Sequence, residues 1–158
     1  MKYTFTTLLL LFPILIGAAC DQATPLPADG KQNNNEETTD SMSNTLKIKV
    51  GSKEFTATLL DNPSATAFKS MLPLTINMTE LNGNEKYFDL PKSLPTNTSN
   101  PGTINTGDLL LWGSNTLVLF YKTFSTSYSY TKLGKIDDPT GLAAALGTGN
   151  VNVTIESQ

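Results

Sequence analysis

The sequence predicts a mainly β domain, a closed barrel of about eight strands with two short helices. Several short segments alternate apolar and polar residues with the period of a strand that buries one face. Turn-forming glycine, asparagine and proline separate these segments at regular intervals. Only two short stretches carry the start and stop signals of helices. Closing the strands into a barrel would remove the exposed edges of the sheet.

The domain is expected to open with a β-hairpin over residues 46–60, where apolar residues alternate on both sides of the turn Gly51-Ser52. Asn62 and Pro63 have the pattern of an N-cap followed by proline at the first helical position. This pattern predicts a short helix to about Met71.

Two further strands are expected at 74–81 and 86–90, joined by turn-forming residues at 82–84. The stretch 91–106 contains three prolines and many polar residues, and it predicts a long loop. Loops of this length are either functional or loose.

The most apolar hairpin is predicted from segments 108–112 and 116–121. Continuous apolarity favours strands that are covered on both faces. Asp138 and Pro139 indicate a second capped helix start, followed by a short helix at 142–146. One more alternating strand, 151–155, closes the domain.

The first 19 residues have the features of a secretory signal peptide. A positive charge at Lys2 precedes an apolar run over residues 8–16, and small residues lead directly to Cys20. The competing interpretation is a transmembrane helix, which needs about 20 apolar residues to cross the ~30 Å core of a bilayer. The run at 8–16 is about half that length, which favours the signal peptide. Residues 17–20 resemble the bacterial lipobox. The resemblance implies that the chain is cut before Cys20 and that lipid is attached to this cysteine.

Lipidation at Cys20 predicts a protein of the bacterial cell envelope, anchored to the lipid membrane and either facing the periplasm or exposed at the surface. Residues 20–44 would then comprise the lipidated cysteine and a tether. The tether has almost no apolar residues to bury, so we expect it to be disordered. The barrel domain is predicted to occupy residues 45–158.

Composition excludes several classes of function. The formal net charge is -3, all 11 basic residues are lysines, and the chain contains neither arginine nor histidine. A nucleic-acid surface would need clustered basic residues, and there is no such cluster. Without histidine, Ser-His-Asp and Cys-His catalysis and histidine-ligated metals are excluded. We expect no cofactor and no metal, and we interpret the scattered lysines as solvated.

The order of the predicted elements resembles the bacterial cyclophilin-like family, whose barrels are related in fold to the peptidyl-prolyl isomerases. The residues that carry the resemblance are the hairpin 46–59, Asn62-Pro63 with its helix, and the segments 107–112, 117–121 and 130–136. The resemblance implies an eight-stranded barrel with a helix at each end. Isomerases of this fold use an arginine beside the twisting amide, and a lysine cannot reproduce its planar fork of donors.

The leading hypothesis is therefore a non-catalytic module that binds a peptide, a glycan or a small ligand. The alternative is an enzyme, a divergent peptidyl-prolyl isomerase without the usual arginine. A purely structural or adhesive envelope protein is a third possibility.

Aromatic residues are the strongest candidates for a ligand-binding groove, because tyrosine and tryptophan combine a large apolar area with a polar group. The competing interpretation, packing in the barrel core, applies most to Trp112 and Phe120. Alternation at 128–130 would place both tyrosines on one face of a strand. The residues predicted to line the groove are Trp112, Tyr121, Tyr128 and Tyr130.

Asp137 and Asp138 are the other candidates, as cation ligands or paired carboxylates. Beside Pro139, capping of the following helix is the simpler interpretation.

Overall fold

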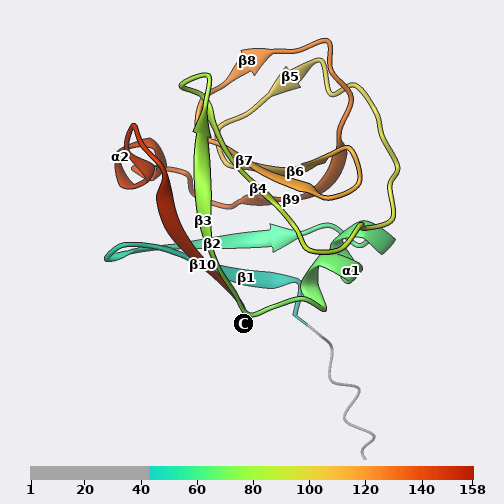
Figure 1. The fold of residues 1–158 in the computed structure, drawn as a ribbon, viewed down its shortest axis with the longest axis horizontal. Coiled ribbons are helices and arrows are strands. Elements are labelled where there is room, and N and C mark those ends of the chain that lie inside the picture. Colours follow the sequence, from blue (N-terminus) through green and yellow to red (C-terminus); the bar gives the residue numbers. More distant parts are fainter. Residues whose placement is uncertain (1–42) are drawn as a thin grey trace, which may run out of the picture. The chain divides into compact units, whose positions relative to one another are not determined.

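The structure, a computed structural model, describes residues 43–158 and confirms a closed antiparallel barrel of eight strands with two short helices (Figure 1). The order of strands around the barrel is β1-β10-β3-β4-β7-β6-β9-β2, and β5 pairs with β8 in a separate small sheet. The elements are β1 (Thr45–Val50), β2 (Lys53–Leu59), α1 (Pro63–Lys69), β3 (Leu74–Leu81), β4 (Glu85–Asp89), β5 (Thr103–Ile104), β6 (Asp108–Trp112), β7 (Thr116–Phe120), β8 (Phe124–Ser125), β9 (Thr131–Ile136), α2 (Leu142–Leu146) and β10 (Val151–Ser157).

The predicted strands and helices are all present, with ends that differ by one or two residues from expectation. The hairpin β1–β2 pairs Ile48 with Phe55, and both side chains are buried in the core. Helix α1 ends at Lys69 rather than Met71. Two short strands, β5 and β8, were not predicted, and β5 lies within the stretch 91–106 for which the sequence predicted a loop.

Two hydrophobic clusters lie on opposite sides of the barrel wall. The barrel core fills the interior and includes Leu109 and Leu111 of β6. Between these two, Leu110 points outward into a second group, which we call the outer cluster. Both faces of β6 and β7 are therefore covered, as their continuous apolarity predicts. The outer cluster consists of Ile104, Leu110, Val118, Phe120 and Tyr130, with Tyr87 and Phe124 packed against it.

The two helices lie at opposite ends of the barrel (Figure 1). The side chain of Asn62 accepts a hydrogen bond of 2.8 Å from the backbone N–H of Ala65, which confirms the predicted cap of α1. The predicted cap of α2 is wrong, because Gly141 occupies the N-cap position and has no side chain to accept a bond. The Asp138 carboxylate accepts a bond from the N–H of Thr140 instead. In residues 43–158 neither helix has the length and apolarity needed to cross a membrane.

Candidate functional site

A groove with a volume of about 460 Å³ lies on the outer face of the barrel, over β4 and β7. Its position follows from strand register, because Tyr87 of β4 lies opposite Val118 of β7 and both side chains point away from the barrel core. The edge of the outer cluster thus forms the floor of the groove. The volume falls within the range of sites that bind small ligands or single side chains of a peptide.

Three of the four aromatic residues predicted for a groove line this one. They are Trp112 at the end of β6, and Tyr128 and Tyr130 in the segment before β9. The expectation that both tyrosines share one face of a strand is wrong, because residues 126–129 form no strand. Tyr128 is 66% exposed and Tyr130 is 7% exposed, so one tyrosine stands at the rim and the other packs into the wall.

Tyr121 lies elsewhere. Its side chain packs in the barrel core, and its hydroxyl donates a hydrogen bond of 2.7 Å to Glu80. Burial, followed by the effect of Glu80, raises the pKa of Tyr121 to about 12. Phe120 belongs to the outer cluster, and successive side chains of an extended chain point to opposite faces, so Tyr121 faces the interior of the barrel. This alternation separates Tyr121 from the groove.

Tyr130 is held in place from two sides. Its ring packs edge-on against Phe120, with centroids 5.7 Å apart and an interplanar angle of 90°. Its backbone N–H and C=O bond with Ser99 at 3.0 and 2.9 Å, which ties it to the loop 91–106. That loop is further fastened by the bond of 2.7 Å from the N–H of Leu94 to Ser114. The loop therefore supports the wall of the groove, although it does not line it.

Exposed apolar side chains converge on the groove. In the part of the chain that the structure describes, four large hydrophobic residues are exposed, and three of them line this site. These three are Leu81, which is 40% exposed, Trp112, which is 54% exposed, and Tyr128, which is 66% exposed. The fourth, Leu60, lies outside the groove. Such clustering of exposed apolar area on a folded domain marks a surface for interaction.

Two carboxylates that were not among the residues predicted for the groove also line it. Glu85 and Asp89 flank Tyr87 on the outward face of β4. Asp89 accepts a hydrogen bond of 2.7 Å from the hydroxyl of Thr116. Burial, with a further contribution from the charge of Glu80, raises the pKa of Glu85. The period-2 alternation Glu85, Tyr87, Asp89 in the sequence was the signal that could have revealed this face.

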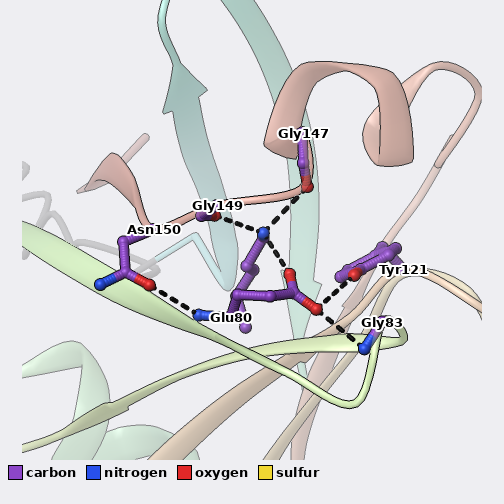
Figure 2. A network of polar contacts seen from close by, with 7 residues as sticks. Glu80, Gly83, Tyr121, Gly147, Gly149 and Asn150 are labelled. Atoms are coloured by element: carbon purple, nitrogen blue, oxygen red, sulfur yellow. Dashed lines mark hydrogen bonds and ion pairs between the residues drawn. The ribbon is translucent and has the colours of Figure 1, made fainter.

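The intervening residue of β4, Lys86, has no exposed surface, which contradicts the interpretation that every lysine is solvated. Its ammonium group forms an ion pair with Glu80 and donates to the carbonyls of Gly147 and Gly149 at 2.9 and 2.6 Å. Figure 2 shows these bonds meeting at one nitrogen, with Tyr121 bonded to the same carboxylate.

This buried network also holds the turn between β3 and β4. The second oxygen of Glu80 accepts a bond of 2.9 Å from the N–H of Gly83, and the N–H of Glu80 donates to Asn150 (Figure 2). Burial acts to raise the pKa of Glu80, but the bonds from Lys86 and Tyr121 outweigh it and lower that pKa. The turn that carries one end of the groove is thus fixed to the loop after α2.

The pair Asp137 and Asp138 lies away from the groove, in a separate pocket beside β2. Hydrogen bonds from Thr140 lower the pKa of Asp138. Within residues 43–158 there is no group of three acidic, cysteine or histidine residues arranged to hold a metal ion. Cys20, the predicted signal peptide and the predicted tether up to residue 42 lie outside the described residues.

Comparison with known proteins identifies the fold family. The model of the Cyclophilin-like family matches residues 48–156. No curated protein matches the chain. Among solved structures, the solution structure of the hypothetical protein AF2241 from Archaeoglobus fulgidus is similar, with a TM-score of 0.51 and 16% identity over 74% of this chain and 96% of that one. At this identity the likeness concerns the fold alone. Since the family match extends over most of the sequence, this chain belongs to the cyclophilin-like family.

Proposed function

We propose that the chain is a lipid-anchored protein of the bacterial cell envelope whose barrel is a non-catalytic binding module. The groove over β4 and β7 would take a peptide, a glycan or a small ligand. The observation that carries the proposal is the convergence of three exposed large hydrophobic residues on one concave site with an aromatic floor. Rigid aromatic side chains lose little conformational entropy when they bind, which suits them to recognition.

The chemistry of the groove supports binding rather than catalysis. The chain has no arginine or histidine, and no lysine lines the site. Its polar groups are two carboxylates, an amide at Asn82, a hydroxyl at Thr116, the indole N–H of Trp112 and the phenols. None of these reproduces the planar pair of donors that an arginine would direct at an amide.

Trp112 provides a direct test, because it is the single tryptophan of the chain and it lines the groove. A ligand that enters should change its emission without any added label. We would titrate the chain with pools of pentapeptides and with short oligosaccharides of N-acetylglucosamine. A saturable change with at least one pool is the expected result, and no change with any probe would contradict the proposal.

Matched leucine variants locate the binding. Leu81 in the groove and Leu60 outside it are 40% and 46% exposed. Leu81→Ala should weaken binding several-fold because it removes apolar contact area. Leu60→Ala should leave binding unchanged. Equal effects of the two variants would show that the ligand does not occupy the groove.

The anchor depends on Cys20. In the Cys20→Ser variant the thiol that would receive lipid is gone, so labelled fatty acid should no longer be incorporated and the protein should leave the membrane fraction. Several acyl chains hold a protein durably on a bilayer. Incorporation of the label into the variant, or its retention in the membrane fraction like the unmodified chain, would refute lipidation at Cys20.

The family match keeps a divergent prolyl isomerase as the second candidate. Uncatalysed rotation about a peptide bond has a barrier of ~18–20 kcal/mol, and catalysis requires a well-placed donor. A protease-coupled proline-peptide assay should therefore show no efficient catalysis. Acceleration comparable to that of cyclophilins, lost in a groove variant such as Tyr130→Phe, would favour the enzyme instead.

A further inference from the structure

The charges that line the groove all have one sign. Glu85 and Asp89 are its only charged residues, and no lysine lies among its lining side chains. Among residues 43–158 the ion pairs are Lys47–Glu54, Lys49–Glu156 and Lys86–Glu80, so neither groove carboxylate has a basic partner in the described part of the chain. Asp89 is exposed and accepts a hydrogen bond from Thr116, whereas Glu85 is half-buried. A half-buried carboxylate without a counter-charge, such as Glu85, is unfavourable unless something else compensates it.

Aromatic rings surround these carboxylates. Tyr87 lies between them along β4, Tyr130 forms part of the wall and Trp112 stands at the end near Asp89, since Thr116 pairs with both Asp89 and Trp112 across the strands. The face of a tyrosine or tryptophan ring attracts an alkylammonium or guanidinium group, and this attraction strengthens when the cation is shielded from water. Carboxylates and ring faces together select a cation that carries an apolar stem.

The spacing along the strand distinguishes an extended chain from a compact ion. Glu85 and Asp89 are four residues apart, which corresponds to roughly 13 Å at about 3.3 Å per residue. One small cation cannot contact both carboxylates over that distance. An extended peptide that lies over the outward face of β4, parallel to this strand, would have the same repeat, so its side chains at positions i and i+4 could meet one carboxylate each.

We propose that the groove recognises an extended peptide through lysine or arginine side chains, with each cation beside a groove carboxylate and its stem against an aromatic ring. This inference rests on the proposed function, because it names the class of ligand for the same site. The net negative charge of the chain does not by itself explain why the charged residues that line the groove are all carboxylates. Lysines occur on the outer surface of β1, β2 and β9, yet none lines the groove.

The test uses Trp112 emission of the full-length chain held in phosphatidylcholine nanodiscs. The probes are three heptapeptides of otherwise uncharged residues, with lysine, acetyl-lysine or glutamate at positions 2 and 6. We expect the lysine peptide to bind at least tenfold more tightly than the acetylated one, and the glutamate peptide to bind worst. Raising the salt concentration should weaken only the lysine peptide, because salt screens charge pairs.

Variants separate the local charges from the net charge. Glu85→Gln and Asp89→Asn should each reduce the affinity for the lysine peptide three- to tenfold and leave the acetylated peptide unchanged. Glu54→Gln removes the same charge at an exposed position outside the groove and should change neither affinity. Circular dichroism of each variant confirms that the barrel is intact.

The outcomes distinguish this inference from the proposal on which it rests. Equal binding of the lysine and acetyl-lysine peptides would overturn the cation preference and leave the groove as a binding site. Saturable binding of spermine without binding of the lysine peptide would overturn the commitment to a peptide. A failure of every peptide and oligosaccharide to alter Trp112 emission would reject both proposals.

Discussion

Two glutamates five residues apart show how local contacts decide the role of a carboxylate. Glu80 is bonded to Lys86, Tyr121 and Gly83, and these bonds lower its pKa although burial opposes them. Glu85 is partly buried without such partners, so its pKa is raised. The first carboxylate stabilises the barrel. The second is energetically unfavourable in the free protein, which is common in residues that serve a binding site.

This difference predicts a pH-dependent effect of Glu85→Gln on stability. A raised pKa in the folded state means that folding favours the protonated form, so Glu85 costs stability once the pH rises through its folded pKa. The variant should therefore melt at a higher temperature than the unmodified chain at pH 7. The gain should vanish below the ordinary value of 4.5, where the carboxyl is neutral in both states. Thermal melts between pH 4 and 7 check this, and a lower melting temperature at pH 7 would contradict it.

Lys86 leads to a second prediction at the scale of the residue. Lys86→Met would leave Glu80 without its buried partner and two carbonyls without their donor. We expect a loss of about 3 kcal/mol in the free energy of unfolding. Lys49→Met is the control, because Lys49 pairs with Glu156 at the surface, where such a pair contributes at most about 1 kcal/mol. Urea unfolding measures both, and equal losses would contradict a structural role for the buried pair.

Single positions were the hardest to predict from the sequence. Because side chains alternate between the two faces of a strand, Trp112 lies on the same outward face of β6 as Leu110. Whether that face is covered depends on β5 and β8, which pack over Leu110 and leave Trp112 54% exposed. The same long-range contacts bury Tyr130. Periodicity therefore assigns a side of the strand, whereas burial depends on elements far away in the sequence.

Most elements were predictable because each carries its own local signal. Alternation identified the strands of the hairpin β1–β2, and Asn62 with Pro63 identified the start of α1. Strands β5 and β8 have two residues each, too few to show a period. Helix α2 begins after a left-handed Gly141, and the preceding Asp138 resembles a cap only in sequence. Elements without a local signal are those that tertiary contacts create.

Strand β9 contains the position where one added methyl group should be most harmful. A Cβ on Gly134 would lie 2.4 Å from the carbonyl oxygen of Thr58 and 2.9 Å from the Cα of Leu59, both backbone atoms of β2. The paired strands β2 and β9 would have to move apart within the closed barrel.

We therefore expect Gly134→Ala to lower the free energy of unfolding by about 2 kcal/mol, within the range for overpacking. Gly149→Ala is the matched control, because no heavy atom lies within 4 Å of its added Cβ. Urea unfolding curves of the two variants decide the matter. Similar stability of the two variants would show that the paired strands β2 and β9 accommodate an added methyl group at position 134 without loss of stability.

The molecule as a whole combines a closed barrel with an N-terminal segment of contrasting composition. Each strand of the barrel pairs with two neighbours, so the barrel presents no open edge to which another strand could be added. Residues 21–44 contain few apolar side chains. The barrel should therefore fold without them, and a lipid at Cys20 would act as an anchor without taking part in packing.

Two residues before the predicted start of the barrel domain form hydrogen bonds with it. The carbonyl of Asn44 accepts a bond of 2.8 Å from the N–H of Leu59, and the carbonyl of Ser43 accepts a bond of 2.8 Å from Lys69. Ser43 and Asn44, which precede the predicted start at Thr45, are thus bonded to the barrel. A fragment that begins at Thr45 loses both bonds, each contributing about 1 kcal/mol.

Three fragments test this description of the whole molecule. The fragment 43–158 should melt within a few degrees of the fragment 21–158, because residues 21–42 offer almost no apolar surface to bury. The fragment 45–158 should melt lower than both, by up to about 10 °C, since it lacks the bonds to Leu59 and Lys69 at about 1 kcal/mol each. A drop of more than about 10 °C on removal of residues 21–42, on the order of 2 kcal/mol for a domain of this size, would mean that the N-terminal segment packs on the barrel.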